Sequence, residues 1–278
     1  MVNCRIGWLR GLSVGGLGLL LMFWQSAPAV AAEYHGIVYP SRDLALSFGV
    51  GGLVAKVNVA VGDRTDDGHT LLVLDQRMAD IEVERRRVLA EDDSELRTLE
   101  ARLAILDELH DNAVKLFDLT GGISQEEVQK LQLELGDTRG RLEQVKSRKL
   151  REALEFRAAE QERQSLRLLA PIAGVVTHVD LDVGEWAKPG EVVLRMVDIS
   201  KCYLRVSVDH AAARNLKPGM RLPLLIDGAG NAAVSGRLSY VAPVADAASG
   251  LVELRVTFDN PRAVVRPGAS GRVRLGDR

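Results

Sequence analysis

The sequence predicts an elongated protein of mixed α and β structure. Its expected parts are a split β-sandwich with an inserted antiparallel α-helical coiled-coil hairpin, followed by a small antiparallel β-barrel. Three observations predict this class. Two strand-rich stretches repeat each other, the residues between them carry leucines at heptad spacing, and a third strand-rich stretch with regular turns follows.

The repeat aligns GLVAKVNVAVGDRTDDGHTLLVL (52–74) with GVVTHVDLDVGEWAKPGEVVLRM (174–196) at a constant offset of 122 residues. Each copy alternates apolar and polar residues, as a half-buried strand does, and then turns at VGD or VGE. The glycines that coincide without a gap, which we assign to turns of the half-motifs, are Gly52, Gly62 and Gly68 in the first copy and Gly174, Gly184 and Gly190 in the second. One copy is too small to bury a core, so we expect the two halves to face each other in a flattened sandwich.

These half-motifs resemble those of lipoyl and biotinyl carrier domains, in which the halves are contiguous and a lysine at the joining hairpin takes the cofactor. Here about ninety residues occupy the joining point. The chain reads VLDQRMAD going out and SLRLLAPIAG coming back, without a lysine at either edge. A lipoyl or biotinyl carrier subunit of an enzyme is therefore the disfavoured alternative function, and we expect no cofactor.

The inserted segment is predicted to be a helical hairpin, because residues 75–119 contain no glycine or proline. Seam positions spaced three and four apart are Leu96, Leu99, Leu103, Leu106, His110, Ala113 and Phe117 on the outward arm, and Val128, Leu131, Leu135, Thr138, Leu142 and Val145 on the return arm. A period of 3.5 predicts antiparallel coiled-coil packing. Each arm, unbroken over about 43 residues, would be ~65 Å long. Toward the base, where Lys149 and Glu152 take seam positions, we expect the arms to splay or to pack against neighbours.

The tip of the hairpin is predicted at residues 119–124. Gly121 and Gly122 end the first helix, and Ser124 with Glu127 three residues later has the spacing of a capping box. The charged residues along both arms indicate a solvated helix face. A hairpin of this length buries little surface of its own, so we expect it to project from the β-domain and contact another molecule at its tip.

The N-terminus has the three parts of a secretory signal peptide, predicted over residues 1–32. Arg5 and Arg10 precede an uncharged run of 14 residues and then the small residues of QSAPAVAA, with cleavage expected after Ala31 or Ala32. An uncleaved anchor is the alternative, but 14 residues are short for a bilayer core that takes about 20. After cleavage Cys202 is the single cysteine, which excludes an intramolecular disulfide.

Composition excludes several classes of function. With a net charge of −2, no basic block and 4% aromatic residues, nucleic-acid binding is not expected. The histidines, at positions 35, 69, 110, 178 and 210, have no ligand spacing, so we expect no metal site. No arrangement of nucleophile and base stands out. We therefore expect no catalytic residues and no enzyme activity.

The third strand-rich segment, residues 201–278, is predicted to form the β-barrel, with turn signals at Lys217-Pro218-Gly219 and Arg266-Pro267-Gly268. The other expected boundaries are 33–75 for the N-terminal strand with the first lipoyl-like half-motif, 76–167 for the hairpin and 168–200 for the second half-motif.

A signal peptide, a split lipoyl-like half-motif, an inserted hairpin and a barrel ending VVRPGASGRVRL resemble, in this order, the periplasmic adaptors of the haemolysin-D-like (membrane fusion protein) family. The resemblance implies a non-catalytic efflux or export subunit in the periplasm of a Gram-negative cell. Its partners would be an inner-membrane transporter and an outer-membrane channel, and it would form a homo-oligomeric ring, a hexamer or trimer of dimers. We favour a resistance-nodulation-division (RND) transporter over an ATP-driven (ABC) one, because no transmembrane anchor remains after cleavage.

The chain departs from this family at two places. Many family tips carry Arg-x3-Leu-x6-Ser, whereas here Ala113 and Phe117 stand at the arginine and leucine positions and only Ser124 is kept. The residues expected to dock the channel are Ala113, Phe117, Thr120, Gly121, Gly122 and Ser124. The chain also stops at Arg278, just after the barrel, without a full membrane-proximal domain. We expect a compact adaptor whose barrel faces the inner-membrane partner directly, or one that needs a second adaptor.

Overall fold

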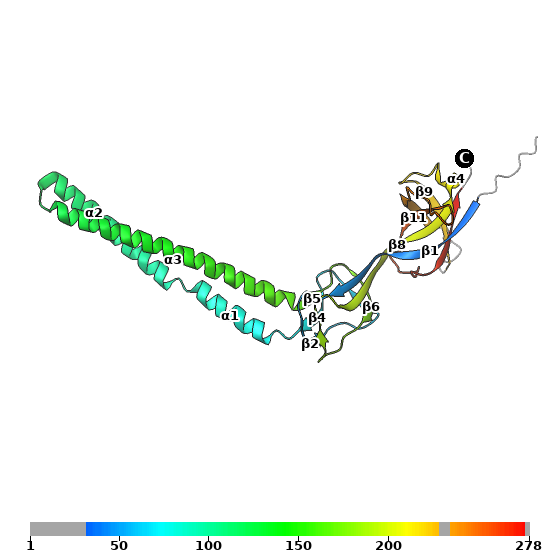
Figure 1. Cartoon of the computed structure of the whole chain (residues 1–278), viewed down its shortest axis with the longest axis horizontal. Helices are drawn as coiled ribbons and strands as arrows, with labels where there is room; N and C mark the ends of the chain where they lie inside the picture. The colour runs from blue at the N-terminus through cyan, green and yellow to red at the C-terminus, as the bar shows by residue number, and fades with distance from the viewer. Residues whose placement is uncertain (1–31, 228–233, 276–278) are drawn as a thin grey trace, which may run out of the picture.

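The structure, a computed structural model, describes residues 32–227 and 234–275, so the predicted signal peptide lies outside the described residues except for Ala32. The molecule is elongated, with a helical hairpin at one end, a β-barrel at the other and a β-sandwich between them (Figure 1). Its helices are α1 (Arg77–Glu91), α2 (Ser94–Thr120), α3 (Gln125–Ser165) and α4 (His210–Ala213). Across 32–227 and 234–275, none of the helices combines the length and apolar character needed to span a bilayer.

The sandwich consists of two packed sheets. One contains, in spatial order, β5 (Arg167–Leu169), β4 (Thr70–Leu74), β2 (Gly52–Val57) and β7 (Trp186–Ala187). The other contains β3 (Arg64–Thr65), β6 (Gly174–Val179) and the adjoining parts of β1 (Ala32–Ser47) and β8 (Val192–Asp209). Their shared core is led by Phe48, Leu71, Leu72, Leu74, Leu194 and Met196.

The two halves of the sandwich are related by an approximate two-fold symmetry that follows the sequence repeat. The Gly62 amide donates to the Val176 carbonyl, and the Gly184 amide donates to the Val54 carbonyl, with each residue displaced by 122 from its counterpart. The same relation joins Gly68 to Ala170 and Gly190 to Phe48.

The repeated turns also share their backbone conformation. Gly62 and Gly184 have φ of 97° and 94°, and Gly68 and Gly190 have φ of 79° and 76°. A positive φ costs glycine little but strains other residues, which explains why these four positions are kept in both copies. Gly52 and Gly174 lie in strands β2 and β6, so the assignment of these two glycines to turns is wrong. A Cβ at Gly174 would approach the Val197 carbonyl oxygen to 2.7 Å, so this glycine permits close strand packing instead.

The barrel is closed by six strands. These are β1, β12 (Ser270–Leu275), β9 (Arg221–Ile226), β10 (Val234–Val241), β11 (Leu251–Asp259) and β8, and the pairing of β1 with β8 completes the circle. Its core residues alternate along each strand and include Val38, Leu204, Leu224, Leu238, Leu254, Val256 and Val273.

The barrel needs a strand from outside residues 201–278. The first half of β1 pairs with β12 on one side and with β8 on the other, and Val38 lies in the barrel core. Beyond a register shift between Pro40 and Arg42, the same two strands continue into the sandwich. The N-terminal strand, predicted together with the first half-motif, therefore also closes the barrel, and the expected barrel of residues 201–278 alone is incomplete. Without this strand the sheet would have two open edges.

Candidate docking tip and its supporting hairpin

The tip joins α2 to α3 through a short turn whose hydrogen bonds are local. Gly121 ends α2 in the left-handed region with φ 61°, and its amide donates to the Phe117 carbonyl at 3.2 Å. The Thr120 hydroxyl donates to the Leu116 carbonyl at 2.8 Å and accepts from the Gly122 amide at 3.2 Å. These contacts leave a narrow, ordered end to the hairpin.

The return helix begins at a side-chain cap. Ser124 has extended backbone, and its hydroxyl oxygen accepts from the Glu127 amide at 3.2 Å. This confirms the serine half of the predicted capping box. Glu126 and Glu127 lie in the first turn of α3, where negative charge complements the helix dipole.

Apolar side chains are exposed around this end of α2. Leu116, Phe117 and Leu119 keep 51%, 39% and 82% of their surface exposed. These three large apolar residues lie in the last turn of α2, with Leu116 and Leu119 on one side of the helix and Phe117 on another. They give the end of the hairpin an exposed apolar surface, which we call the tip patch. Leu119 was not predicted as a docking residue from the sequence. The signal available was its position, two residues after Phe117, the last seam residue.

Ala113 does not belong to this surface. It is 3% exposed, because it lies in the seam between α2 and α3 together with Leu106, Leu135 and Leu142. A partner cannot reach it, so its expected role in docking is wrong, and its contribution is to hold the arms together below the tip. Thr120, Gly121, Gly122 and Ser124 are all exposed, as docking requires.

The predicted seam holds the two arms over most of their length. The seam residues Leu96–Ala113 and Val128–Val145 are the less exposed residues of their helices, whereas Phe117 lies outside the packed part. Ion pairs cross between the arms beside the seam, from Arg102 to Glu134 at 2.8 Å and from Arg139 to Asp107 at 2.7 Å. These pairs are individually weak at exposed positions, but their spacing supports one register of the arms.

The outward arm is broken, contrary to the prediction of one unbroken helix. It stops at Glu91 and restarts at Ser94, so it consists of α1 and α2 (Figure 1). The Asp92 carboxylate accepts from the Ser94 amide at 3.1 Å and from the Ser94 hydroxyl at 2.6 Å. Such local bonds compete with the helix, which explains a break without glycine or proline.

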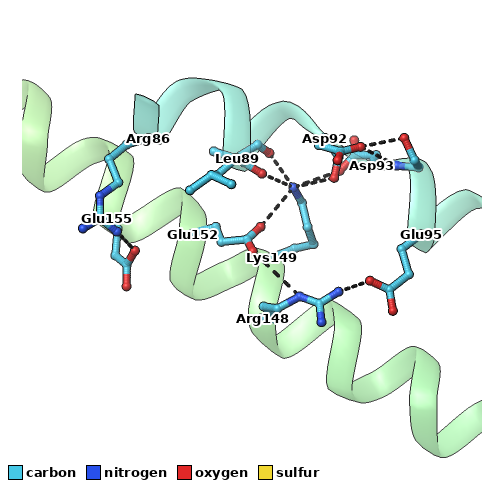
Figure 2. Close-up of polar contacts among 11 residues, drawn as sticks. Arg86, Leu89, Asp92, Asp93, Glu95, Arg148, Lys149, Glu152 and Glu155 are labelled. Carbon is cyan, nitrogen blue, oxygen red and sulfur yellow. Dashed lines mark hydrogen bonds and ion pairs between the residues drawn. The ribbon is translucent and has the colours of Figure 1, made fainter. Parts of the chain in front are cut away.

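Lys149 of α3 fills this break. Its ammonium donates to the carbonyl oxygens of Leu89, Ala90 and Asp92 at 2.9, 2.8 and 2.9 Å, and it also lies 3.2 Å from a Glu152 oxygen (Figure 2). Those carbonyls belong to the end of α1, where helical partners are missing and positive charge is favoured.

We call Lys149 with its partners Leu89, Ala90, Asp92, Asp93 and Glu152 the lysine clasp. On either side of it, Arg86 pairs with Glu155 and Arg148 pairs with Glu95 (Figure 2). The polar seam positions near the base therefore bind the arms together. Of the two alternatives expected for the base, splaying of the arms is therefore wrong, since they are held together there.

The break between α1 and α2 coincides with a change in the spacing of the seam residues. In α1 the residues facing α3 are Ala79, Val83, Arg86 and Ala90, at spacings of four, three and four. Leu96 follows Ala90 after six residues, one fewer than a heptad. A continuous helix would rotate one set away from α3, so the break keeps both sets facing it.

At the other end of the sandwich, Asp198 lies where β8 continues from the sandwich into the barrel, and it accepts a hydrogen bond from Ser41 of β1. Burial raises the pKa of this carboxyl, but hydrogen bonds from Ser200 and Ser41 outweigh burial and leave the pKa below its usual range. Cys202 follows in the barrel core, where burial raises the pKa of the thiol, so that it is protonated and enclosed at neutral pH. Cys202 thus serves as a small residue of the barrel core.

Within the described residues, no three His, Cys, Asp or Glu side chains gather as metal ligands require. The sandwich and the clasp together support the hairpin, which presents the apolar tip patch at its far end.

Comparisons with known proteins agree with this architecture. Residues 201–278 match the family model of the CusB-like β-barrel domain. The chain is 25% identical over 228 residues to an uncharacterised protein of Haemophilus influenzae, covering 81% of this chain and 51% of that protein. It is 21% identical over 232 residues to the macrolide export protein MacA of Escherichia coli O157:H7, covering 81% and 62%. The chain thus spans between half and two thirds of the length of these relatives.

The crystal structure of MacA from Actinobacillus actinomycetemcomitans matches with a TM-score of 0.65 at 17% identity, over 89% of this chain and 79% of that one. This match confirms the predicted fold class, including the inserted hairpin and the barrel.

Proposed function

Because the chain carries a CusB-like β-barrel domain and is related to the membrane fusion proteins, we propose that it is a non-catalytic adaptor of an efflux or export system. It joins an inner-membrane transporter to an outer-membrane channel across the periplasm. The tip patch binds the channel, and the barrel end lies on the transporter side. A predicted signal peptide supports the periplasmic location.

The observation that carries this proposal is the position of the tip patch. α3 has 41 residues, which is about 62 Å of helix, so the tip patch at the end of α2 lies far from the sandwich. Exposed apolar side chains also occur singly along the shaft, for example Leu133 and Leu150, but at the tip three lie within four residues. Contact between proteins uses apolar side chains at the centre of a patch, and Phe is among the residues enriched there. Phe117 stands at the leucine position of the usual family tip and can keep its apolar contact, whereas the charged contact of the arginine is lost because Ala113 stands at that position.

Affinity purification from native cell envelopes tests the proposal. Tagged protein is expected to recover one inner-membrane transporter, whose class is then identified, and one outer-membrane channel. The variant Phe117→Asp/Leu119→Asp is expected to lose the channel and keep the transporter. Leu133→Asp is the matched control, because Leu133 is also exposed (75%) but lies on α3 outside the tip patch. Recovery of the channel by the tip variant at the unaltered level would contradict the proposal.

The adaptor is further proposed to form a homo-oligomeric ring. The apolar residues Leu53 and Trp186 lie opposite each other in the pairing of β2 with β7 and are exposed on the sandwich. A neighbouring copy that covers them would remove this apolar surface from water. Mass measurement of the protein in detergent-free solution and in the purified complex tests the number of copies.

A further inference from the structure

Charge is divided unequally along the chain. Residues 201–278 hold twelve Lys and Arg against six Asp and Glu, a net charge of +6, while the whole chain has −2. The preceding 200 residues therefore carry −8. An asymmetry of this size between two parts of one molecule points to an anionic partner for the basic part.

Three of these twelve cations line one hollow of the barrel. The hollow has a volume of about 470 Å³, and its charged lining residues are Lys201, Arg221, Arg237 and Asp259. Ser235 and Thr257 add hydroxyl groups to the lining. We call these six residues the basic cleft.

The two arginines of the basic cleft are placed unfavourably for stability alone. Arg221 on β9 and Arg237 on β10 are directly opposite each other in the strand register, and both are exposed. Like charges in this position repel. Neither arginine forms an ion pair with any acid in residues 32–227 or 234–275. A bound anion would remove this repulsion.

Two further arginines lie on strands that also carry residues of the basic cleft, Arg255 on β11 and Arg205 on β8. Neither lines the cleft, and Arg255 is ion-paired with Glu253 at 2.8 Å. Arg255 lies 5.2 Å from the ring centre of Tyr240 and 5.6 Å from that of Tyr203, and Arg205 lies 4.3 Å from that of Tyr39. The rings of Tyr39 and Tyr203 are stacked at 5.5 Å. Arginines held over aromatic rings have already lost much of their rotamer freedom, so these two groups keep fixed positive charge on the strands that also carry Thr257 and Lys201.

We propose that the basic cleft binds a phosphate group, either that of an anionic phospholipid headgroup or that of a free phosphate compound. Three cations and one acid leave a net charge of +2, which fits a doubly charged anion. The fork of N–H donors on each arginine matches phosphate oxygens in pairs, and Ser235 and Thr257 lie in the same lining. The inference does not depend on the adaptor function, because it concerns the opposite end of the molecule from the tip patch.

Two binding measurements on the purified full-length protein distinguish the sources. Sedimentation with phosphatidylcholine vesicles, with and without phosphatidylglycerol, tests the headgroup. Calorimetric titration with inorganic phosphate, against sodium chloride at matched ionic strength, tests the free anion. The variant Arg221→Gln/Arg237→Gln is expected to bind about tenfold or more weakly. The matched control Arg214→Gln/Arg266→Gln removes the same charge from the barrel segment outside the basic cleft.

Vesicle binding that the cleft variant loses and the control keeps supports the headgroup as the source. Phosphate binding with the same pattern, but no vesicle binding, supports a free phosphate compound. Equal loss in the control, or no binding in either measurement, overturns the proposal. So does binding to poly-glutamate that inorganic phosphate fails to displace, since that result assigns the cleft to an acidic protein. Displacement of the unaltered protein from vesicles by phosphate is a second test that needs no variant.

Discussion

Replacing Lys149 by methionine removes the ammonium that binds the end of α1 to α3. Methionine keeps most of the apolar stem, so the change isolates the polar contacts. Lys149 is 14% exposed, and three carbonyl oxygens within 2.9 Å lose their donor. A hydrogen bond to a charged group is worth about 1.5–3 kcal/mol, but water reaches the carbonyls at this break. We therefore expect the three together to contribute about 2–3 kcal/mol rather than their sum.

The loss is expected in the stability of the helix end rather than in the fold as a whole. Hydrogen exchange of the amides in the last turn of α1 measures the free energy of local opening. Exchange there is expected to accelerate about 30- to 100-fold in Lys149→Met, since each 1.4 kcal/mol is a factor of ten. Amides of the barrel are expected to be unaffected.

Lys146→Met is the matched control for this prediction. Lys146 lies on the same helix, but its side chain is 47% exposed and its ion pair, with Glu143 at 3.2 Å, is within α3. A pair of this kind contributes only a few tenths of a kcal/mol. Equal exchange rates in the two variants would refute the assignment of a clasp and leave the broken arm without its stabilising contact.

Four further predictions follow from individual contacts. Cys202 is expected to resist a thiol reagent in the folded barrel at neutral pH and to react on unfolding in urea, because it is buried with a raised pKa; rapid labelling without denaturant would contradict this. Asp198 has a lowered pKa in the folded state, so its contribution is complete above the unfolded value of about 3.9 and is lost as pH falls below it. Acid titration is therefore expected to destabilise the barrel less in Asp198→Asn than in the unaltered chain, and equal acid sensitivity would argue against this role. Gly184→Ala is expected to lower the free energy of unfolding by about 1–2 kcal/mol, because a φ of 94° strains a residue with a Cβ. An unchanged melting temperature would refute this. Gly136→Ala, in the exposed middle of α3 with no atom near the added methyl group, is expected to stabilise by about 1 kcal/mol in the same measurement, and a loss of stability would show that the space is not free.

The sequence was sufficient for features that depend on local periodicity or on a repeated turn. The spacing of Leu106, Ala113, Leu135 and Leu142 identified the faces that pack together, since a helix places residues three and four apart on one side. The recurrence of glycine at an offset of 122 residues identified the turns, because positive φ values are needed at both copies.

Features that depend on contacts between distant segments were not visible in the sequence. Lys149 reads as an interruption of the seam, and its partners lie on α1, about sixty residues earlier. Asp92 followed by Asp93 and Ser94 was a signal for a helix break, but helix propensity alone favours continuation. Likewise, the sequence around the start of β1 does not show that this strand belongs to the barrel, because its partner β12 lies at the other end of the described chain. The exposure of Leu119 depends on where the coiled coil stops, which the heptad spacing does not reveal.

Photo-crosslinking in cells from the tip patch tests the central claim most directly. A photoreactive amino acid is placed at Leu119, which is 82% exposed, and at Leu133 of the shaft, 75% exposed, as the control. Products are identified by mass spectrometry. The adaptor account predicts a crosslink from position 119 to an outer-membrane channel and none from position 133 to the same channel. Crosslinks from both positions to the channel, or from position 119 only to other copies of this chain, would contradict docking through the tip.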